Sequence, residues 1–177
     1  MRIIGGKYKG RRFFPPKNNP ARPTTDFAKE GLFNIIENNW DIVGLKVLDL
    51  FGGTGSISFE FASRGCTDIT IVEKHRPNTF FMRHVAEELD FALRIVSGDV
   101  FKFIETTPEK YDLIFAGPPY PLKNLADLPG LVFEFELLNP DGWFVLEHSP
   151  EHAFEEHPRF RHKRTYGNTN FSIFINN

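Results

Sequence analysis

Short apolar runs alternate with stretches of helical spacing through most of the chain. The runs cover residues 47–51, 69–73, 93–97, 113–116 and 143–147, and a polar residue, glycine or proline follows most of them. Strands that are apolar nearly throughout and alternate with helices are typical of a parallel sheet buried on both faces, with right-handed crossovers. The pattern therefore predicts an α/β, doubly wound fold.

Both ends of the chain depart from this alternation. Residues 160–166 and 171–175 are strand-like and flank the turn-like residues 167–170, which predicts a C-terminal antiparallel hairpin and a mostly parallel sheet of seven strands. Near the N-terminus, residues 21–25 predict an extended lead into a helix capped by Thr24 or Thr25, with Asp26 and Glu30 in its first turns. Its apolar positions recur at helical spacing and should pack on the core: Ala28, Leu32, Ile35 and Ile36.

Length and composition limit the possible classes of protein. The chain has 177 residues, of which 41% are hydrophobic and 25% charged, as expected for one globular domain. No apolar run is long enough to span a bilayer, and we expect a cytoplasmic protein without a membrane partner. Cys66 is the single cysteine, which excludes an intrachain disulfide. Pro150 separates His148 from His152, so we expect surface histidines and no metal site.

Charge is unevenly distributed. Residues 1–25 carry seven basic residues and no acid, so this segment has a charge of +7 and the remainder −9. Aromatic residues lie among these charges, a mixture suited to phosphates and unpaired bases. We predict a basic arm over 1–25, joined to an α/β domain over 26–177, with RNA contacts from Arg2, Lys7, Lys9, Arg11, Arg12 and Arg22. The alternative is a solvated hairpin. A second basic cluster, at residues 159–164, favours a solvated strand face.

Glycines and acids follow the first three predicted strands. Ligands bind at the carboxyl ends of strands in open parallel sheets. The loop 49–55 contains three glycines, Glu73 ends the second strand, where it could bind ribose hydroxyls, and Asp99 follows the third, where it could bind an adenine amino group. A dinucleotide fingerprint requires a further glycine that the loop lacks, and Asp49 suits a cationic ligand. The set therefore favours S-adenosylmethionine over NAD.

The fourth strand runs into Gly117-Pro118-Pro119-Tyr120. This sequence resembles the motif of amino-methylating class I methyltransferases, which is Asn or Asp, Pro, Pro, then Tyr or Phe. With the segments 2–6, 9–11, 22–26 and 30–34, the chain resembles, nearly end to end, the bacterial 16S ribosomal RNA guanine-N2 methyltransferase family, which modifies guanine 966. The resemblance and the loops together assign the cofactor site to Thr24, Asp49, Phe51, Gly52, Gly53, Thr54, Gly55, Glu73, Lys74, Asp99 and Val100.

The resemblance implies that residues 26–177 form a class I methyltransferase domain and that the enzyme acts on 16S ribosomal RNA or the small ribosomal subunit. We expect it to be a monomer, although no feature of the sequence determines the oligomeric state. The motif residues would hold a flipped guanine, whose amine would donate a hydrogen bond to the Pro118 carbonyl and whose ring would stack on Tyr120. Gly117 departs from the family motif because it has no side-chain acceptor. Losing one such preorganised group typically lowers a rate by about 100-fold to 1,000-fold, so we expect weakened or retargeted catalysis with cofactor binding retained.

Other functions share these features. A catalytically impaired, S-adenosylmethionine-binding RNA-binding or assembly factor would also carry the basic arm and the cofactor loop. Adenine-N6 DNA methyltransferases share the Pro-Pro-Tyr chemistry, but 177 residues leave no room for a separate target-recognition domain. Glutamine-N5 methyltransferases of release factors share it too, although those enzymes carry a helical N-terminal domain in place of a short basic arm.

Overall fold

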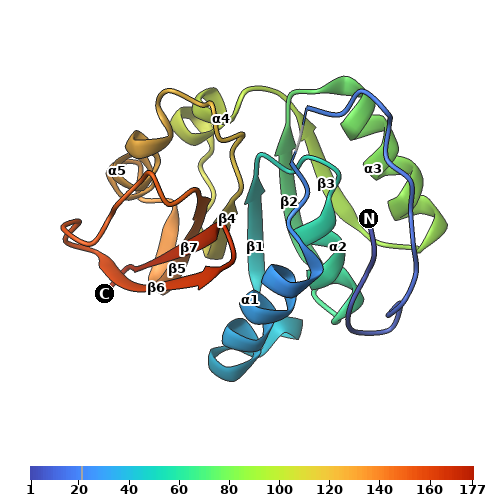
Figure 1. Ribbon diagram of the computed structural model, residues 1–177, viewed down its shortest axis with the longest axis horizontal. Coiled ribbons are helices and arrows are strands. Elements are labelled where there is room, and N and C mark those ends of the chain that lie inside the picture. Colours follow the sequence, from blue (N-terminus) through green and yellow to red (C-terminus); the bar gives the residue numbers. More distant parts are fainter. Residues whose placement is uncertain (21) are drawn as a thin grey trace.

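A seven-stranded sheet forms the centre of the protein (Figure 1). The computed structural model describes residues 1–20 and 22–177, so Ala21, in the predicted lead into the first helix, lies outside the described residues. The strands lie in the order β3-β2-β1-β4-β5-β7-β6. Their bounds are Lys46–Leu50 for β1, Asp68–Glu73 for β2, Leu93–Ser97 for β3, Tyr111–Ala116 for β4, Leu138–His148 for β5, Phe160–Tyr166 for β6 and Thr169–Ile175 for β7.

The first five strands are parallel, and β7 pairs antiparallel with both β5 and β6. The predicted doubly wound sheet with a C-terminal hairpin is therefore confirmed. The helices that connect or flank the strands are α1 (Asp26–Asn39), α2 (Ser56–Ser63), α3 (Arg76–Glu88), α4 (Val100–Thr106) and α5 (Leu128–Glu134), with short 3-10 turns at Ile42–Gly44 and Leu125–Asp127. Within the described residues, no helix is long and apolar enough to cross a membrane.

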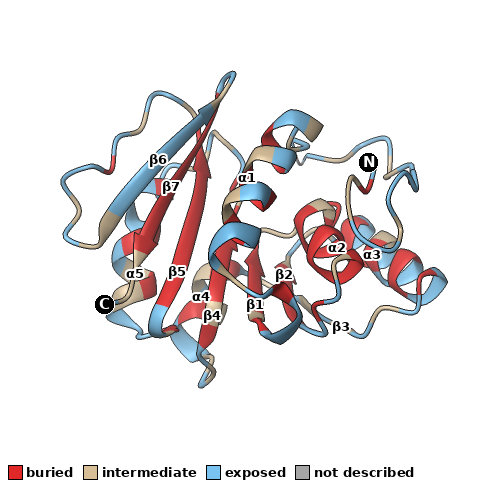
Figure 2. Cartoon of the chain, turned by 90° about the horizontal axis from the view of Figure 1, so that it is seen from below, coloured by how far each residue is buried: buried red, intermediate tan, exposed pale blue. Residues whose placement is uncertain are grey.

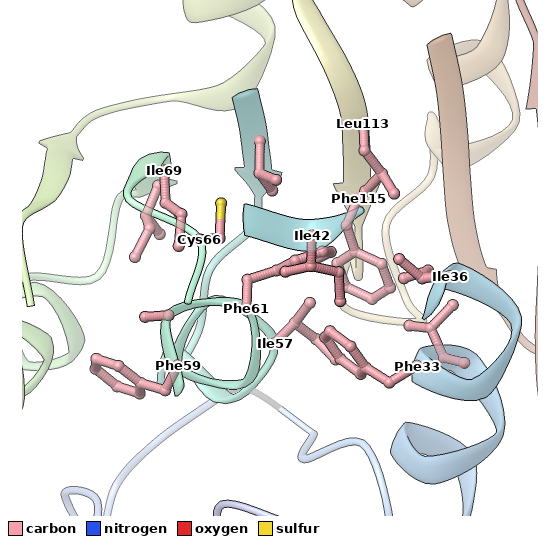
Figure 3. Close-up of a cluster of buried hydrophobic side chains, with 14 of the residues drawn as sticks. Phe33, Ile36, Ile42, Ile57, Phe59, Phe61, Cys66, Ile69, Leu113 and Phe115 are labelled. Atoms are coloured by element: carbon pink, nitrogen blue, oxygen red, sulfur yellow. The ribbon is translucent and has the colours of Figure 1, made fainter. Parts of the chain in front are cut away.

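Two hydrophobic cores lie on opposite faces of the sheet because successive strand residues point to opposite sides. Val47 and Leu113 face the core formed with α1, α2 and α3, whereas Leu48 and Ile114 face the core formed with α4 and α5. Figure 3 shows part of the first core, where side chains of α1, α2 and β4 meet: Phe33, Ile36, Ile57, Phe61, Leu113 and Phe115. Burial on both faces explains why the strands are apolar throughout.

The helix α1 forms where its capping residue and apolar spacing place it. Thr25 is the N-cap, and its hydroxyl accepts a hydrogen bond from the Ala28 amide at 3.2 Å. One face of the helix is buried on the sheet and the opposite face is exposed (Figure 2), with Leu32 and Ile36 fully covered. The predicted packing of this helix on the core is confirmed.

The first thirteen residues fold against α2 through both apolar and polar contacts. Ile3 is 1% exposed, the Ile4 amide donates to the Glu60 carboxylate at 2.7 Å, and the Lys7 amide donates to the Ser63 carbonyl at 2.7 Å. Gly6 allows the close approach, since its φ is +73° and an added Cβ would lie 2.0 Å from the Ser63 oxygen. An isolated antiparallel bridge joins Arg2 and Arg12. The segment thus presents its basic side chains from a fixed backbone.

Two local predictions need correction or refinement. His148 is fully buried, not on the surface, because β7 covers the end of β5 and Ser172 lies 2.7 Å from the His148 Nε2 atom. The strand β5 begins at Leu138, five residues before the predicted start, since Leu138 pairs with Tyr111 across a register shift. By contrast, β6 is exposed along most of its length (Figure 2), which confirms the solvated face predicted for residues 159–164.

Candidate cofactor and substrate site

The site lies at the point where the order of the parallel strands reverses, between β1 and β4. The chain passes from β1 outward to β2 and β3, then returns to place β4 on the other side of β1. Ligands bind at such a switch point in open α/β sheets. Leu50 of β1 pairs with Ala116 of β4, and the Gly117 amide donates to the Leu50 carbonyl at 3.4 Å. The glycine loop and the Pro-Pro-Tyr motif therefore begin side by side.

A cavity of about 420 Å³ occupies this edge of the sheet. Its volume lies within the usual range for small-molecule sites, about 300 to 1,000 Å³. Most of the predicted site residues line it: Arg22, Phe51, Gly53, Glu73, Lys74, Asp99, Val100, Gly117, Pro118, Pro119 and Tyr120. The wall is completed by Phe101 and Glu147, which follow the third strand and end the fifth, and by residues that sequence reasoning missed, namely Pro20, His75, Asn78, Gly98 and Leu122.

A recess of about 40 Å³ brings together the other predicted cofactor residues except Gly55. Thr24, Asp49, Gly52 and Thr54 line it, and they share it with Phe51, Gly53, Gly117 and Glu147 of the larger cavity. Gly55 shapes the loop from behind: its φ is +84°, it is the N-cap of α2, and an added Cβ would lie 2.6 Å from the Phe59 ring. A side chain at residue 55 would therefore push the loop away from α2.

Asp49 is a buried acid inside β1. It is 2% exposed, and the Ser58 hydroxyl donates to its carboxylate at 2.6 Å. Burial raises the pKa of Asp49 to about 7, and the negative charges of Glu73 and Glu147 act in the same direction, whereas the Ser58 hydrogen bond opposes them. Among the residues that the structure describes, no basic side chain forms a salt bridge with Asp49, so this buried carboxyl suits a positively charged ligand group.

The other two acids occupy the strand ends at which we expected them. The Glu73 carboxylate accepts hydrogen bonds from the Gly53 amide at 2.6 Å and from the His75 amide at 2.8 Å, so it fixes the glycine loop. Asp99 is the N-cap of α4, where it accepts from the Lys102 amide at 3.1 Å. A carboxylate offers about four acceptor positions, so both acids keep capacity for hydroxyl or amino groups of a ligand.

The donor set fits S-adenosylmethionine. Glu73 and Asp99 line the cavity at the ends of the neighbouring strands β2 and β3, and Phe51, Val100 and Phe101 supply apolar surface for a purine. Asp49 would hold the cationic part of the molecule in the adjoining recess. The cavity therefore offers apolar surface for the adenine, acids for its amino group and the ribose hydroxyls, and a buried acid for a charged amino-acid tail.

The motif after β4 forms the other wall of the cavity. The Arg22 guanidinium lies 4.8 Å from the centre of the Tyr120 ring, so the ring that we expected to stack on a base is covered by a cation. Glu147, at the end of β5, is 6% exposed and accepts a hydrogen bond from the Thr24 hydroxyl at 2.7 Å. Burial raises the pKa of Glu147, and Thr24, Arg22 and Tyr120 partly oppose this effect.

Five of the six predicted RNA-contacting residues lie within the first thirteen residues, and two of these five border an open cavity of about 610 Å³. Arg2 and Arg12 line this cavity together with Phe13 and Phe14, and the Phe14 side chain is 87% exposed. Two of the basic residues already have acidic partners, since Arg2 contacts Asp26 and Arg11 contacts Glu88. Lys7 lies over the Tyr8 ring and Lys9 lines a neighbouring hollow.

Fold and site together define a class I S-adenosylmethionine-dependent methyltransferase. A family model described as Conserved hypothetical protein 95 matches residues 1–175, and the chain belongs to this family. A Bacillus subtilis protein, YlbH, is 30% identical over 182 residues, with 98% of each chain covered. The Escherichia coli protein named Ribosomal RNA small subunit methyltransferase D is 30% identical over 148 residues, which cover 83% of this chain and 71% of the relative.

Two solved structures share the fold of this chain over nearly its whole length. A hypothetical protein of Thermus thermophilus has a TM-score of 0.86 and 26% identity, with 98% of both chains covered. The methylase from Haemophilus influenzae has a TM-score of 0.80 and 23% identity, with 99% of this chain and 98% of the other covered. The latter likeness supports the fold alone. Both coverages extend over the N-terminal segment and the C-terminal hairpin.

Proposed function

We propose that the protein transfers a methyl group from S-adenosylmethionine to the exocyclic N2 amine of a guanine in 16S ribosomal RNA. The observation that carries this proposal is the position of Pro118, Pro119 and Tyr120 on the wall of a cavity that also holds Glu73 and Asp99. A methyl donor bound between the two acids would face the motif. The guanine at position 966 is the target that the family resemblance implies.

Acidic side chains would hold the cofactor, whereas the backbone of the Pro-Pro-Tyr motif would hold the guanine. Asp49 would pair with the cationic amino-acid part of the cofactor, while Glu73 and Asp99 would accept from its ribose and adenine. S-adenosylmethionine, when bound, supplies an electrophilic methyl group on a sulfonium. On the substrate side, the consecutive prolines fix the backbone so that the Pro118 carbonyl can accept from the amine. Positioning of this kind can supply much of the rate enhancement.

The base would enter beside Tyr120. Because Arg22 lies over the Tyr120 ring, an incoming guanine would either replace Arg22 or stack on the guanidinium, whose plane also supports stacking on bases. The exposed Phe14 ring and the basic side chains of Arg2 and Arg12 border the open cavity nearby and would contact the RNA backbone and unpaired bases. The relative from Escherichia coli, named as a ribosomal RNA small subunit methyltransferase, supports this class of substrate.

Transfer of radiolabelled methyl groups tests the proposal. In separate reactions, the purified protein and labelled S-adenosylmethionine are incubated with one substrate each. The substrates are unmodified small ribosomal subunits, naked 16S RNA, large subunits, double-stranded DNA and a release factor. We expect label in the small-subunit RNA alone. Label in DNA or in the release factor would replace the proposal with an adenine-N6 or glutamine-N5 methyltransferase. Cofactor and RNA binding without label in any substrate would support a non-catalytic RNA-binding factor.

A further inference from the structure

The space beside Gly117 already contains a carboxylate from another strand. An added Cβ at residue 117 would lie 3.5 Å from the Oε2 atom of Glu147 and 3.1 Å from the Cε1 atom of the Phe115 ring. Glu147 and Gly117 line both the cavity and the adjoining recess. The Phe115 ring packs close enough to Gly117 that a larger residue would displace it by a few tenths of an ångström. The surroundings are therefore shaped around glycine.

We propose that Glu147 supplies, from the end of β5, the side-chain acceptor for the guanine amine that residue 117 lacks. The inference rests on the proposed function, since the acceptor is needed for an exocyclic amine substrate. The Pro118 carbonyl and the Glu147 carboxylate would then form the pair of acceptors for the two N–H groups of the amine. If so, Gly117 does not weaken catalysis, because the acceptor that it lacks is supplied by Glu147 of the neighbouring strand β5.

The contacts of Glu147 favour this role over a purely structural one. Its carboxylate is 6% exposed, and Thr24 donates to Oε2 at 2.7 Å, which leaves acceptor positions on both oxygens. A buried carboxylate with spare acceptor capacity has an energetic cost unless a donor reaches it. Arg22 and Tyr120 lie close enough to favour its charged form, and Asp49 is the nearby group of like charge. An amine N–H entering the cavity would meet that requirement.

The chemical step balances with Glu147 as the acceptor. The lone pair of the guanine amine forms the new N–C bond, and the bond between methyl carbon and sulfur breaks, leaving its electron pair on sulfur. The nitrogen then loses one proton, which passes along the existing hydrogen bond to the Glu147 carboxylate and from there to water. Burial raises the pKa of this carboxyl, which makes its ionised form a better proton acceptor than a solvated glutamate.

A set of four proteins tests the assignment: wild type, Glu147→Gln, Gly117→Asn and the double variant. In the wild-type background, Glu147→Gln should lower kcat by about 100-fold with the KM for S-adenosylmethionine unchanged. In the Glu147→Gln background, Gly117→Asn should raise kcat at least about tenfold, because its side-chain oxygen replaces the lost acceptor. Gly117→Asn alone measures what the added side chain costs where it meets the Phe115 ring. The exposed Glu105 gives a matched control, Glu105→Gln, which should behave as wild type.

A binding measurement separates recognition of the amine from other effects. An RNA fragment with guanosine at the labelled position is compared with one carrying inosine, which lacks the amine, in the presence of S-adenosylhomocysteine. Wild type should bind the guanosine RNA about tenfold more tightly, and Glu147→Gln should lose this preference. Equal preferences in the two proteins, weaker cofactor binding by Glu147→Gln, or no recovery with Gly117→Asn would overturn the role of Glu147. Absence of label with all four proteins would instead refute the proposed function, and this inference with it.

Discussion

Asp49 should destabilise the protein when it is ionised and no cofactor is bound. The carboxyl is 2% exposed and accepts a hydrogen bond from Ser58 at 2.6 Å, yet burial raises its pKa to about 7. In the unfolded chain an aspartate has a pKa of about 3.9. Between these two values the folded state binds more protons than the unfolded state, so the free energy of unfolding decreases as pH rises from about 4 to about 7.

The size of the effect follows from the two pKa values. The difference between about 3.9 and about 7 corresponds to about 4 kcal/mol when Asp49 is fully ionised, as at pH 8. At pH 5 Asp49 is protonated in the folded protein, whereas it is mostly ionised in the unfolded chain. This ionisation stabilises the unfolded state and lowers the free energy of unfolding by about 1.5 kcal/mol. Asp49→Asn keeps the shape and an acceptor for Ser58 without the charge. It should therefore raise the free energy of unfolding by up to these amounts.

Urea denaturation of the cofactor-free protein at pH 5 and pH 8 measures the difference. The gain in stability from Asp49→Asn should be larger at pH 8, while the exposed control Asp127→Asn should show the same small change at both pH values. The same Asp49→Asn variant should bind S-adenosylmethionine at least about tenfold more weakly, since it loses a charged partner. An Asp49→Asn variant less stable than wild type at pH 8, or a gain independent of pH, would refute the reasoning.

Three further predictions concern the N-terminal segment and its support. Lys29→Met should lower the free energy of unfolding by about 3 to 5 kcal/mol, because Lys29 is 1% exposed and pairs with the buried Glu60 at 2.9 Å; an unchanged urea midpoint would contradict this. Gly6→Ala should destabilise more than Gly10→Ala, since both have positive φ but only Gly6 lacks space for a Cβ; equal thermal shifts would contradict it. Arg12→Ala should weaken RNA binding and reduce the salt-dependence slope by about one; an unchanged slope would place Arg12 outside the RNA contact.

The alternation of apolar runs and helices was sufficient to predict the fold. The strands at 93–97 and 160–166 have the predicted bounds, because turn residues lie directly beside them. The start of β5 was not predicted, since residues 139–142 have the composition of a turn. Leu138 pairs with Tyr111, and the Asp141 amide and the Gly142 carbonyl hydrogen-bond with the Asn176 backbone, which makes this stretch part of a strand. A local pattern cannot reveal a pairing partner that lies far along the chain.

The candidate site was predictable where chemistry follows the strand ends in sequence. Asp49, Glu73, Asp99 and the Pro118-Pro119-Tyr120 motif share one edge of the sheet because parallel strands bring their carboxyl ends together. The contact of Thr24 with Glu147 joins residues 123 positions apart and leaves no local signal. Arg22 was expected at the RNA backbone, whereas it lies over Tyr120, a position set by the approach of the N-terminal segment to the motif.

Identification of the methylated nucleoside tests the central claim most directly. Unmodified small subunits are incubated with the protein and S-adenosylmethionine. The 16S RNA is then digested to fragments and to nucleosides, and mass spectrometry identifies the modified nucleoside and the fragment that carries it. The predicted result is N2-methylguanosine from a single position, with less product at a limiting cofactor concentration when Asp49→Asn replaces wild type. A methylated adenosine, or no methylated nucleoside from a protein that binds both RNA and cofactor, would contradict the account.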